Sequence, residues 1–512
     1  MGQNRLPECI RLHRDDNVVI ARASLALGAY VRGEDITCRT GIPSGHKVSS
    51  ARIRAGDRVL RYGEIIGVAT VDIEPGDHVH SHNLTTVGAE RNRNDVQGRG
   101  ATVRVPAPAT FSGIRRPDGR IGTRNYVGVL ATVNCAGTVV RGIADHFRRS
   151  PMERSTGAFG NVDGVVGLTH TGGCGVDPEG YGLRLLRRTL SGYLRHPNFH
   201  SVVLIGLGCE TNQLRGVLEE ELPTDADRIR LLEIQQAGGT RRAIAAGVEL
   251  VQQLLVSANT VAHVDCPLSS LVVGLQCGGS DGYSGISANP ALGAAVDLLV
   301  RHGGTAILSE TPEIIGAEHL LLGRAATPEV ARKLQERLDW WARHCANNGA
   351  SVDNNPSAGN KVGGITTVLE KALGGIAKGG STRLEDVYEY AQRVDRSGLT
   401  FMDTPGYDPV SATGQVAGGA NLICFTTGRG SAYGCKPTPT LKLASNSELW
   451  RRQEDDLDIN CGEIVDGTST VEQMGKRIFE LMVNVASGRP TKSEELGYGQ
   501  EEFVPWQPSV VT

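Results

Sequence analysis

Uninterrupted apolar runs, each about as long as one β-strand, alternate with helix-length segments along most of the chain. The runs occupy residues 126–135, 162–170, 201–210, 270–277, 303–310, 399–404 and 421–427. Amphipathic stretches such as TRRAIAAGVELVQQLLVSA and TPEVARKLQERLDWWARH lie between them. Strands that are apolar along their whole length are typical of a parallel sheet covered by helices on both faces. The sequence therefore predicts an α/β fold for the chain beyond about residue 110.

The first part of the chain follows a different pattern. Residues 10–84 consist of short alternating runs separated by glycine, such as NVVIARASL and GDRVLRYGEIIGVAT. Short strands with turn residues at regular intervals predict a small all-β module. Residues 85–110 are polar, contain glycine and proline and show neither a helical nor a strand period, which predicts a linker. A chain of 512 residues has room for two to four domains, so a boundary there is expected.

Composition excludes several classes of function. The chain has 53 Lys and Arg against 56 Asp and Glu, so no global positive field is available for nucleic acid, which is not expected as a partner. No apolar run approaches the roughly 18 residues that span a bilayer, and the first residues lack the apolar core of a signal peptide. We therefore expect a cytoplasmic protein without a membrane partner. Eleven cysteines, an odd number with no CxxC pair, predict reduced thiols.

Reactive side chains gather at or just past the ends of the apolar runs. They are Cys135, His170, Cys174, Cys209, Glu210, Cys277, Ser309, Glu310, Asp403 and Arg429. In open parallel sheets, ligands bind outside the carboxyl ends of the strands, because the loops there converge on one crevice. These residues could therefore share one site although they are far apart in the sequence.

Histidines are concentrated in the predicted all-β module. His46 stands in GHK, and His78, His80 and His82 stand in DHVHSHN. Residues two apart on a strand face the same side, so these last three could present their imidazoles on one face. Imidazole is a common ligand for divalent metals and a proton carrier near neutral pH. An exposed polar strand face without function explains the pattern equally well.

Cysteines at strand ends are candidate metal ligands. Cys135, Cys174, Cys209 and Cys277 stand in NCA, GGCG, GCE and QCGG. Thiolates bind soft or borderline metals, and glycines beside them allow the backbone to approach an ion closely. Three or four such residues could hold iron, either as a single ion or as a cluster. The alternative is that they are small buried hydrophobes, the most common role of free cysteine.

Glutamates follow the run that ends at residue 310. Glu310 and Glu313 stand in SETPE, and Glu310 is the better candidate for a metal or substrate contact. A favourable interaction of Glu313 with the dipole of the next helix explains that residue equally well.

Three glycine- and hydroxyl-rich loops could bind an anion. Ser280 and Asp281 stand in GGSDG, Asn360 and Lys361 in NPSAGNK, and Arg429 in TTGRGS. Successive backbone N–H groups in such loops form concavities for carboxylate, and Arg can grip a carboxylate with two hydrogen bonds. No P-loop occurs, and GLGCET lacks the third glycine of a dinucleotide fingerprint, so a nucleotide cofactor is not supported. Ordinary surface turns would explain any one of these loops.

Long motifs in the chain resemble a known family. GHK with RYGEIIG and VHSHN, then RPDGRIGTRNY, TVNCA, GLGCETNQ, QCGGSDGYSGISANPALG, SETPEIIGAEHLL, NPSAGNKVGGITT and FTTGRGS are similar to the altronate and galactarate dehydratases, a family of sugar-acid hydro-lyases. The resemblance implies a β-clip module of the SAF type over 1–87, a linker over 88–110, a middle α/β domain over 111–260 that forms a homodimer, and a Rossmann-like parallel domain over 261–512. It also implies dependence on Fe²⁺, with Mn²⁺ as an alternative and an iron–sulfur cluster left open.

Details of the motifs bear on the substrate. VHSHN and GAEHLL look more like altronate dehydratase than galactarate dehydratase, whereas FMDTPGYDP and DINCGEI look like neither. A related branch, sulfolactate sulfo-lyase, divides the same two parts between separate chains and expels sulfite instead of water. We expect dehydration of an altronate-like aldonate to a 2-keto-3-deoxy acid. Galactarate or another aldarate, a sulfo-lyase-like reaction, and a sugar-acid-binding module without activity are the alternatives.

Dehydration of a sugar acid requires a base, an acid, a cation and a clamp for the carboxylate. The sequence offers candidates for each role, and we hypothesise the following assignment. Metal ligands are Cys135, Cys174 and Cys277, with Glu310 as a further one. Substrate contacts are Ser280, Asp281, Asn360 and Arg429, with Lys361 as a catalytic residue that also holds the carboxylate. Acid–base residues are His46, His80 and His82, which would close over the site from the module, with His170 as an alternative base.

Overall fold

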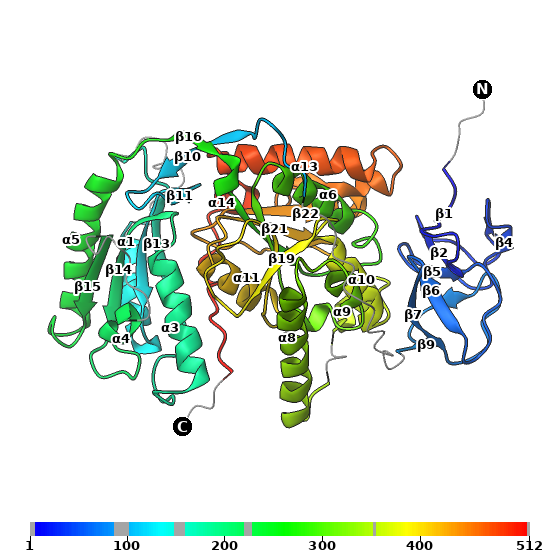
Figure 1. Ribbon diagram of the computed structural model, residues 1–512, viewed down its shortest axis with the longest axis horizontal. Coiled ribbons are helices and arrows are strands. Elements are labelled where there is room, and N and C mark those ends of the chain that lie inside the picture. The colour runs from blue at the N-terminus through cyan, green and yellow to red at the C-terminus, as the bar shows by residue number, and fades with distance from the viewer. Residues whose placement is uncertain (1–5, 87–101, 148–158, 220–227, 352–354, 509–512) are drawn as a thin grey trace.

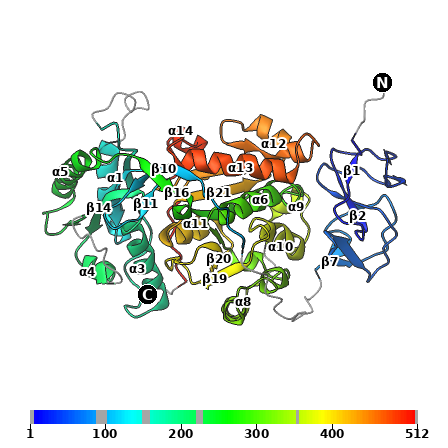
Figure 2. The same ribbon diagram turned by 45° about the horizontal axis from the view of Figure 1, so that its top comes forward.

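Three groups of β-sheets follow one another along the chain in the computed structural model (Figure 1). The structure describes residues 6–86, 102–147, 159–219, 228–351 and 355–508. The all-β module lies at one end of the molecule, the middle sheet at the other, and the large C-terminal sheet between them (Figures 1 and 2). Part of the predicted linker, 88–110, falls outside the described residues; residues 102–109 contain no strand or helix, and Thr110 begins a strand.

The N-terminal module consists of short antiparallel strands. They are β1 (Cys9–Ile10), β2 (Val18–Ala21), β5 (Lys47–Ser49) and β8 (His78–Val79) in one sheet, β6 (Arg58–Arg61), β7 (Glu64–Ala69) and β9 (Leu84–Thr85) in a second, and the pair β3 (Tyr30–Val31) and β4 (Ile36–Thr37). Two separate small clusters of buried aliphatic and cysteine side chains form its interior. The glycine-separated pattern of the sequence therefore correctly predicted an all-β unit.

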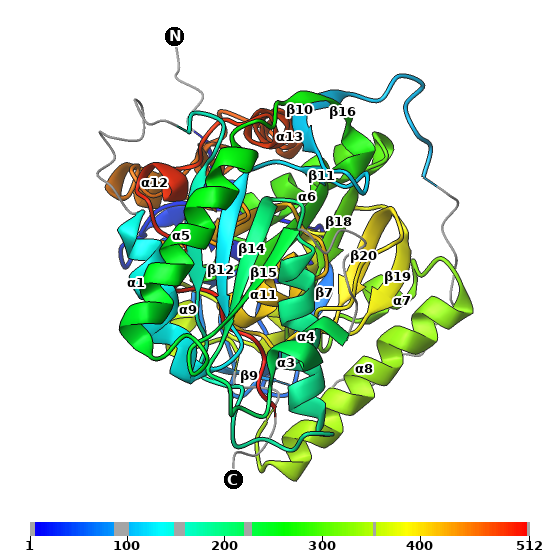
Figure 3. The ribbon, with the colours of Figure 1, turned by 90° about the vertical axis from the view of Figure 1, so that its left-hand side faces the viewer.

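The middle sheet is entirely parallel. Its order is β13 (Gly164–Leu168), β12 (Tyr126–Ala131), β14 (Phe199–Gly206) and β15 (Ile229–Glu233). Helices α1 (Gly137–His146) and α5 (Thr240–Ala258) cover one face, and α3 (Tyr181–Leu194) and α4 (Leu214–Glu219) cover the other (Figure 3). All six residues of the central strand β12 are buried, as expected for a strand with helices on both sides.

The C-terminal sheet has seven parallel strands. Their order is β19 (Leu384–Tyr388), β20 (Gly398–Met402), β18 (Thr305–Leu308), β17 (Val272–Cys277), β21 (Leu422–Thr427), β22 (Thr440–Ala444) and β23 (Ile459–Asn460). Chain order reverses between β17 and β21. In sheets of this kind, loops leaving two such neighbouring strands diverge and open a crevice at their carboxyl ends.

Helices cover both faces of this sheet as well. On one face, α6 (Ala288–Arg301) and α13 (Val471–Ala486) pack in a large apolar core, and on the other α11 (Asp408–Ala417) packs against residues of β18 and β21. The remaining helices are α7 (His319–Leu322), α8 (Pro328–Asn347), α9 (Ala358–Val362), α10 (Val368–Ala377), α12 (Ser447–Arg452) and α14 (Lys492–Glu495). The predicted α/β class with parallel sheets is confirmed.

A small antiparallel sheet joins the two α/β parts. It consists of β11 (Ile121–Gly122), β10 (Thr110–Arg115) and β16 (Val264–Pro267), and its residues Phe111, Ile121 and Cys266 belong to the core of the C-terminal part. The chain therefore enters the middle sheet from β11 and returns through β16. Within the described part of the chain, no helix combines the length and apolar character that a membrane crossing requires.

Candidate functional site

Three buried side chains with metal-binding atoms meet where β17 and β18 end. Cys277 is the last residue of β17, Glu310 follows β18, and Glu313 lies in the short 3-10 helix Thr311–Glu313. Their ligand atoms all lie within 4.8 Å of one another, and the Cys277 thiol donates to Glu313 Oε2 at 3.6 Å. The structure thus brings together two of the predicted metal ligands and adds Glu313.

Two lysines from the region of α10 contact this group. Lys378 Nζ lies 2.9 Å from Cys277 Sγ and 3.4 Å from Glu310 Oε2. Lys371 Nζ donates to Glu313 Oε1 at 2.6 Å. All five side chains are buried. Charges removed from water need partners of opposite sign, and here each lysine contacts one glutamate.

Electrostatics separate the two glutamates. Burial, and after it the neighbouring Glu313, raise the pKa of Glu310 to about 8. Burial opposes ionisation of Glu313 too, but Lys371 and Lys378 outweigh it and lower the pKa of that carboxyl. Asp408, at the start of α11, has its pKa raised to about 6 by burial and by Glu313. Carboxyl groups that titrate near neutral pH are suited to proton transfer.

Glu310 also has a strained backbone. Its φ and ψ are 70° and 66°, a left-handed conformation that is uncommon for residues other than glycine. Its N–H donates to Thr404 Oγ1 at 2.9 Å, whereas its side-chain Oε1 is buried without a hydrogen-bond partner. Strain of this kind persists where the surroundings hold a residue in place, and it is concentrated at functional sites.

The donor set of this group fits a divalent cation such as Fe²⁺. One thiol and two carboxylates are a mixed set of the kind that borderline metals accept. Glu310, Glu313 and Asp408 face two ammonium groups, so when all three are ionised one negative charge remains without a counter-ion. The unpartnered Oε1 of Glu310 is where such an ion would be held.

The loops after β17 and β21 are joined at the reversal of strand order. Gly278 N donates to Thr426 O at 3.1 Å, and Gly428 N donates to Gly279 O at 3.0 Å. The predicted substrate contact Asp281 is buried beside these loops and accepts hydrogen bonds from Ser284, Tyr283, Ser445 and Asn446. Its carboxylate therefore organises the loop.

The other predicted anion-binding residues lie around the same segment. Asn360 Nδ2 donates to the backbone oxygen of Ser280 at 2.9 Å, which ties the NPSAGNK loop to the GGSDG loop. Lys361 is half-buried in α9, and Arg429 is exposed in the loop after β21. The three loops therefore lie along one edge of the C-terminal sheet.

The four predicted histidines form one cluster on the module. The ring centroid of His46 lies 5.1 Å from those of His78 and His80, and the ring of His82 lies 5.5 Å from that of His78. His46 Nε2 and His80 Nε2 lie 3.2 Å and 2.9 Å from the backbone oxygens of Val362 and Lys361. Burial lowers the pKa of His46 to about 4, so its imidazole is neutral at pH 7. The cluster therefore faces the C-terminal part at the NPSAGNK loop.

A buried ionic contact attaches the module to the C-terminal part. Lys47 Nζ lies 2.9 Å from both carboxylate oxygens of Glu370, and Arg61 donates to the same carboxylate. Arg61 and Tyr62 also line a cavity of about 10 Å³ together with Cys277 and Lys371. The module therefore covers the Cys277 group.

The predicted residues of the middle sheet lie elsewhere. Cys135 and Cys174 follow β12 and β13 of that sheet, are exposed and do not belong to the described Cys277 group. His170 is buried, with Nε2 donating to Ala131 O at 3.0 Å and Nδ1 accepting from Gly172 N at 3.2 Å. Both ring nitrogens of His170 therefore hold the loop that follows β13.

Comparison with known proteins covers nearly the whole chain. Residues 7–87 match the family model described as altronate/galactarate dehydratase SAF domain, residues 113–259 the D-galactarate dehydratase/altronate hydrolase second domain, and residues 268–511 the D-galactarate/altronate dehydratase C-terminal domain. The chain is 35% identical over 497 residues to altronate dehydratase of Bacillus subtilis (strain 168), covering 95% of this chain and 96% of that protein. The chain belongs to the altronate/galactarate dehydratase family. The resemblance of the motifs is thereby confirmed.

Other relatives of this dehydratase family differ in named substrate. Galactarate dehydratase (L-threo-forming) of Escherichia coli (strain K12) is 36% identical over 517 residues, covering 98% of this chain and 97% of that protein. The beta subunit of (2R)-sulfolactate sulfo-lyase of Chromohalobacter salexigens is 30% identical over 400 residues, covering 77% of this chain and 96% of the subunit. Identity alone therefore does not separate the substrates within the dehydratase family.

The sequence analysis did not predict several charged residues that lie in or beside the site of this family member. Lys47, Glu370, Lys371 and Lys378 were not predicted as part of the site. The available signal was that one glutamate and one lysine of α10 interrupt a segment, VLEKALGGIA, that is otherwise apolar or glycine. Charged residues in such a helix indicate either one solvated face or buried ion pairs. The structure shows buried ion pairs.

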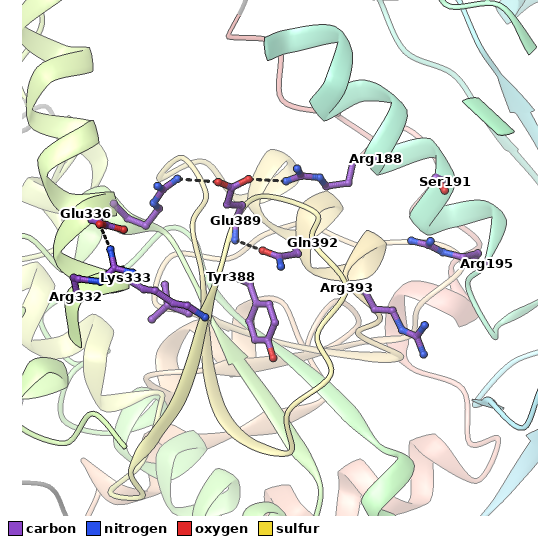
Figure 4. A pocket seen from close by; sticks show the side chains of 12 residues that line it. Arg188, Ser191, Arg195, Arg332, Lys333, Glu336, Tyr388, Glu389, Gln392 and Arg393 are labelled. Carbon is purple, nitrogen blue, oxygen red and sulfur yellow. Dashed lines mark hydrogen bonds and ion pairs between the residues drawn. The ribbon is translucent and has the colours of Figure 1, made fainter. Parts of the chain in front are cut away.

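A larger cavity of the dehydratase, about 560 Å³, lies between α3, α8 and the loop after β19 (Figure 4). Among the side chains that line it, Glu389 accepts hydrogen bonds from Arg188 at 3.1 Å and from Arg337 at 3.5 Å. The predicted site residues are not among its described lining residues. Size alone therefore does not identify the functional site of this protein.

Proposed function

We propose that this chain is a hydro-lyase that removes water from an altronate-like aldonate and gives a 2-keto-3-deoxy acid. Galactarate or another aldarate is the alternative substrate. The observation that carries the proposal is the buried Cys277, Glu310 and Glu313 group with its two lysines at the carboxyl end of the C-terminal sheet. Membership of the dehydratase family supports the reaction class.

The reaction requires removal of the poorly acidic proton beside the carboxylate and loss of the adjacent hydroxyl. Negative charge then develops on the carboxylate as an enediolate, and fixed positive charge stabilises it. Lys371 and Lys378 supply such charge next to the proposed cation ligands. Fe²⁺ held by Cys277, Glu310 and Glu313 would add Lewis acidity toward the carboxylate and the leaving hydroxyl.

Proton transfer is assigned to the module histidines. A neutral imidazole accepts a proton, and the pKa of His46 is low enough to keep it neutral at pH 7. We propose His46 as the base, with His80 and His82 as the neighbouring proton carriers and Lys361 and Arg429 as contacts for the substrate carboxylate. Arg61 and Tyr62 exclude water from the closed site.

An anaerobic assay tests the proposal. The protein is supplied with Fe²⁺ and with each of a panel of aldonic and aldaric acids, and the 2-keto-3-deoxy products are detected. Glu310→Gln, Cys277→Ser and His46→Ala should each lower kcat by about 100-fold or more, the usual range for loss of a proton-transfer group or metal ligand, without loss of fold. Cys345→Ser, on the outer helix α8, is the matched control and should retain full activity. Full turnover by Glu310→Gln or Cys277→Ser refutes the site.

Three further arms separate the alternatives. Sulfolactate replaces the sugar acid in one arm, and release of sulfite there would support the activity named for the sulfo-lyase relative. Binding of sugar acids without ketoacid formation would support a binding module. Chelator treatment followed by restoration with Fe²⁺ tests the metal, and full activity of the metal-free protein would refute it.

Architecture and assembly complete the proposal. We infer that the C-terminal sheet is a Rossmann-fold variant, which its seven parallel strands and the reversal between β17 and β21 support. We also infer a cytoplasmic homodimer that associates through the middle domain. Light scattering of the full chain and of a variant with a charged substitution on that domain tests the assembly.

A further inference from the structure

Three of the eleven cysteines are exposed, and all three lie at one edge of the middle sheet. They are Cys135, Cys174 and Cys209, whereas the other eight are buried or half-buried. Free cysteine is among the most frequently buried residue types, so its exposure at three neighbouring points is unusual. Each of the three follows the carboxyl end of a strand, and these strands, β12, β13 and β14, are adjacent in the sheet.

Hydrogen bonds draw the three cysteine loops together. Asn134 N, beside Cys135, donates to Gly172 O at 3.0 Å. Asn212 N, in the loop of Cys209, donates to Gly173 O at 2.9 Å, and its side chain donates to Thr132 O at 2.9 Å. The loop of Cys174 therefore contacts both of the other loops across the end of β12.

Glycine permits this close approach. Gly173 has a φ of 102°, and a Cβ atom at that position would lie 2.4 Å from Thr132 O. Gly208, just before Cys209, has a φ of 125°, and a Cβ there would meet Gln235 Oε1 at 2.5 Å. Larger residues would force the loops apart, so the sequence favours a compact arrangement of the three thiols.

Polar groups fix the loop of Cys209 and contact its sulfur. The buried carboxylate of Glu210 accepts hydrogen bonds from the N–H groups of Leu207 and Gly208 and from the Thr132 hydroxyl. Gln235 Nε2 donates to Cys209 Sγ at 3.4 Å. Hydrogen bonds of this kind to cysteine sulfur stabilise thiolates and tune metal centres.

We propose that Cys135, Cys174 and Cys209 bind an iron–sulfur cluster at the carboxyl edge of the middle sheet. A single tetrahedral ion needs its ligand atoms closely grouped, with metal–sulfur bonds of about 2.3 Å. Among the described residues, the three thiols do not form a group whose sulfur atoms all lie within 4.8 Å of one another. A cluster places its thiolates on separate irons and so accepts a wider spacing. Three thiolates on a cluster of four irons leave one iron without a protein ligand, open to water or to an oxygen of a small molecule.

This site is separate from the Cys277 group, and the inference does not depend on the proposed function. The test uses the full chain purified anaerobically and reconstituted with ferric iron, sulfide and a thiol reductant, which together supply both oxidation states of iron in a cluster. We expect broad visible absorption and about four acid-labile sulfide ions per chain. Cys135→Ser, Cys174→Ser and Cys209→Ser should each lower sulfide content about tenfold and abolish the visible absorption, while retaining cooperative unfolding because the three side chains are exposed.

Two control variants locate the cluster. Cys345→Ser, half-buried on α8, and Cys277→Ser, in the C-terminal group, should keep the sulfide content and spectrum of the original chain. The inference is overturned if the reconstituted chain holds iron or zinc without sulfide. It is also overturned if the triple serine variant keeps the spectrum, or if only Cys277→Ser loses it. Failure of the dehydratase assay would leave each of these readouts unchanged.

Discussion

The charges of Lys47, Arg61 and Glu370 are fully enclosed between the module and the C-terminal part. Lys47 is 0% exposed and Arg61 is 1% exposed. Burial opposes ionisation of Glu370, yet Lys47 and Arg61 outweigh burial and lower the pKa of its carboxyl to about 2. A buried ion pair contributes little net stability compared with an apolar contact, but removing one partner leaves an uncompensated charge.

Glu370→Gln should therefore lower the free energy of unfolding by about 3–5 kcal/mol, because Lys47 and Arg61 would remain buried without a counter-ion. Denaturant unfolding of the full chain measures the change. Glu64→Gln is the control, since Glu64 is half-buried and lies 3.7 Å from His319, a pair expected to contribute less than about 1 kcal/mol. Equal stability losses in the two variants would contradict the role of Glu370.

The sequence predicts those site residues that are marked by a pattern in their immediate sequence neighbourhood. Cys277 and Glu310 were predicted because they end apolar runs, and the histidines because they cluster in the chain. For Glu313 the sequence supports an interaction with the helix dipole equally well, and the structure shows its carboxylate accepting a hydrogen bond from Lys371. That pairing joins the 3-10 helix Thr311–Glu313 to α10 across 58 positions, and no local pattern reports a contact of that range.

At the scale of elements, the predicted apolar runs correspond to β12, β13, β14, β17, β18, β20 and β21. The parallel strands that were missed are β15, β19, β22 and β23. β15, β19 and β23 lie at sheet edges, where one side of the strand is less enclosed, and charged residues interrupt the apolar pattern of β15 and β19. In β22, the buried Lys442 interrupts an otherwise apolar strand. Of the four edge strands in these two sheets, the continuous apolar runs identified β13 and missed β15, β19 and β23, so this pattern is less complete at sheet edges.

Helix α3 approaches α11 very closely at Gly192. A Cβ at this position would lie 2.4 Å from Ala417 O, the last residue of α11. Gly192→Ala should destabilise the protein by about 1–3 kcal/mol, because overpacking exceeds the gain in helix propensity of about 1 kcal/mol. Gly137→Ala, in α1, is the control, since its Cβ would meet nothing closer than 3.6 Å. Thermal unfolding of both variants measures the difference, and a stabilised Gly192→Ala would refute the close contact.

At the scale of the whole molecule, the parts are joined in two different ways. The middle and C-terminal parts share one apolar core, in which Leu186 and Tyr193 of α3 accompany Val416 and Phe425. The module instead has its own small cores and meets the C-terminal part through the histidines, Lys47 and Arg61 and through a small apolar cluster in which Ile20 packs with Tyr283, Ile286 and Val465. Sequence patterns predict each part, but they do not predict these contacts, because the contacting residues are hundreds of positions apart.

The closed module leaves too little space for a substrate. The cavity beside Cys277 is about 10 Å³, room for about one water molecule, and a sugar acid is many times larger. We therefore expect the module to move away from the NPSAGNK loop to admit substrate, which would break the contacts of His46 and His80 with that loop. Polar contacts and one small apolar cluster allow such a movement more readily than the large core shared by the other two parts would.

Hydrogen exchange measures this opening directly. Amides of residues 361–366 should exchange through an opening that does not require global unfolding, and a non-reacting sugar-acid analogue should slow that exchange by holding the module closed. Amides of β12, in the middle sheet, are the internal control and should exchange at the same rate with and without the analogue. Thr367→Val removes a 2.6 Å hydrogen bond to Ile66 O in the module and should speed the exchange of residues 361–366. If saturating analogue leaves that exchange unchanged while it inhibits turnover, the site is entered by another route and the module does not open.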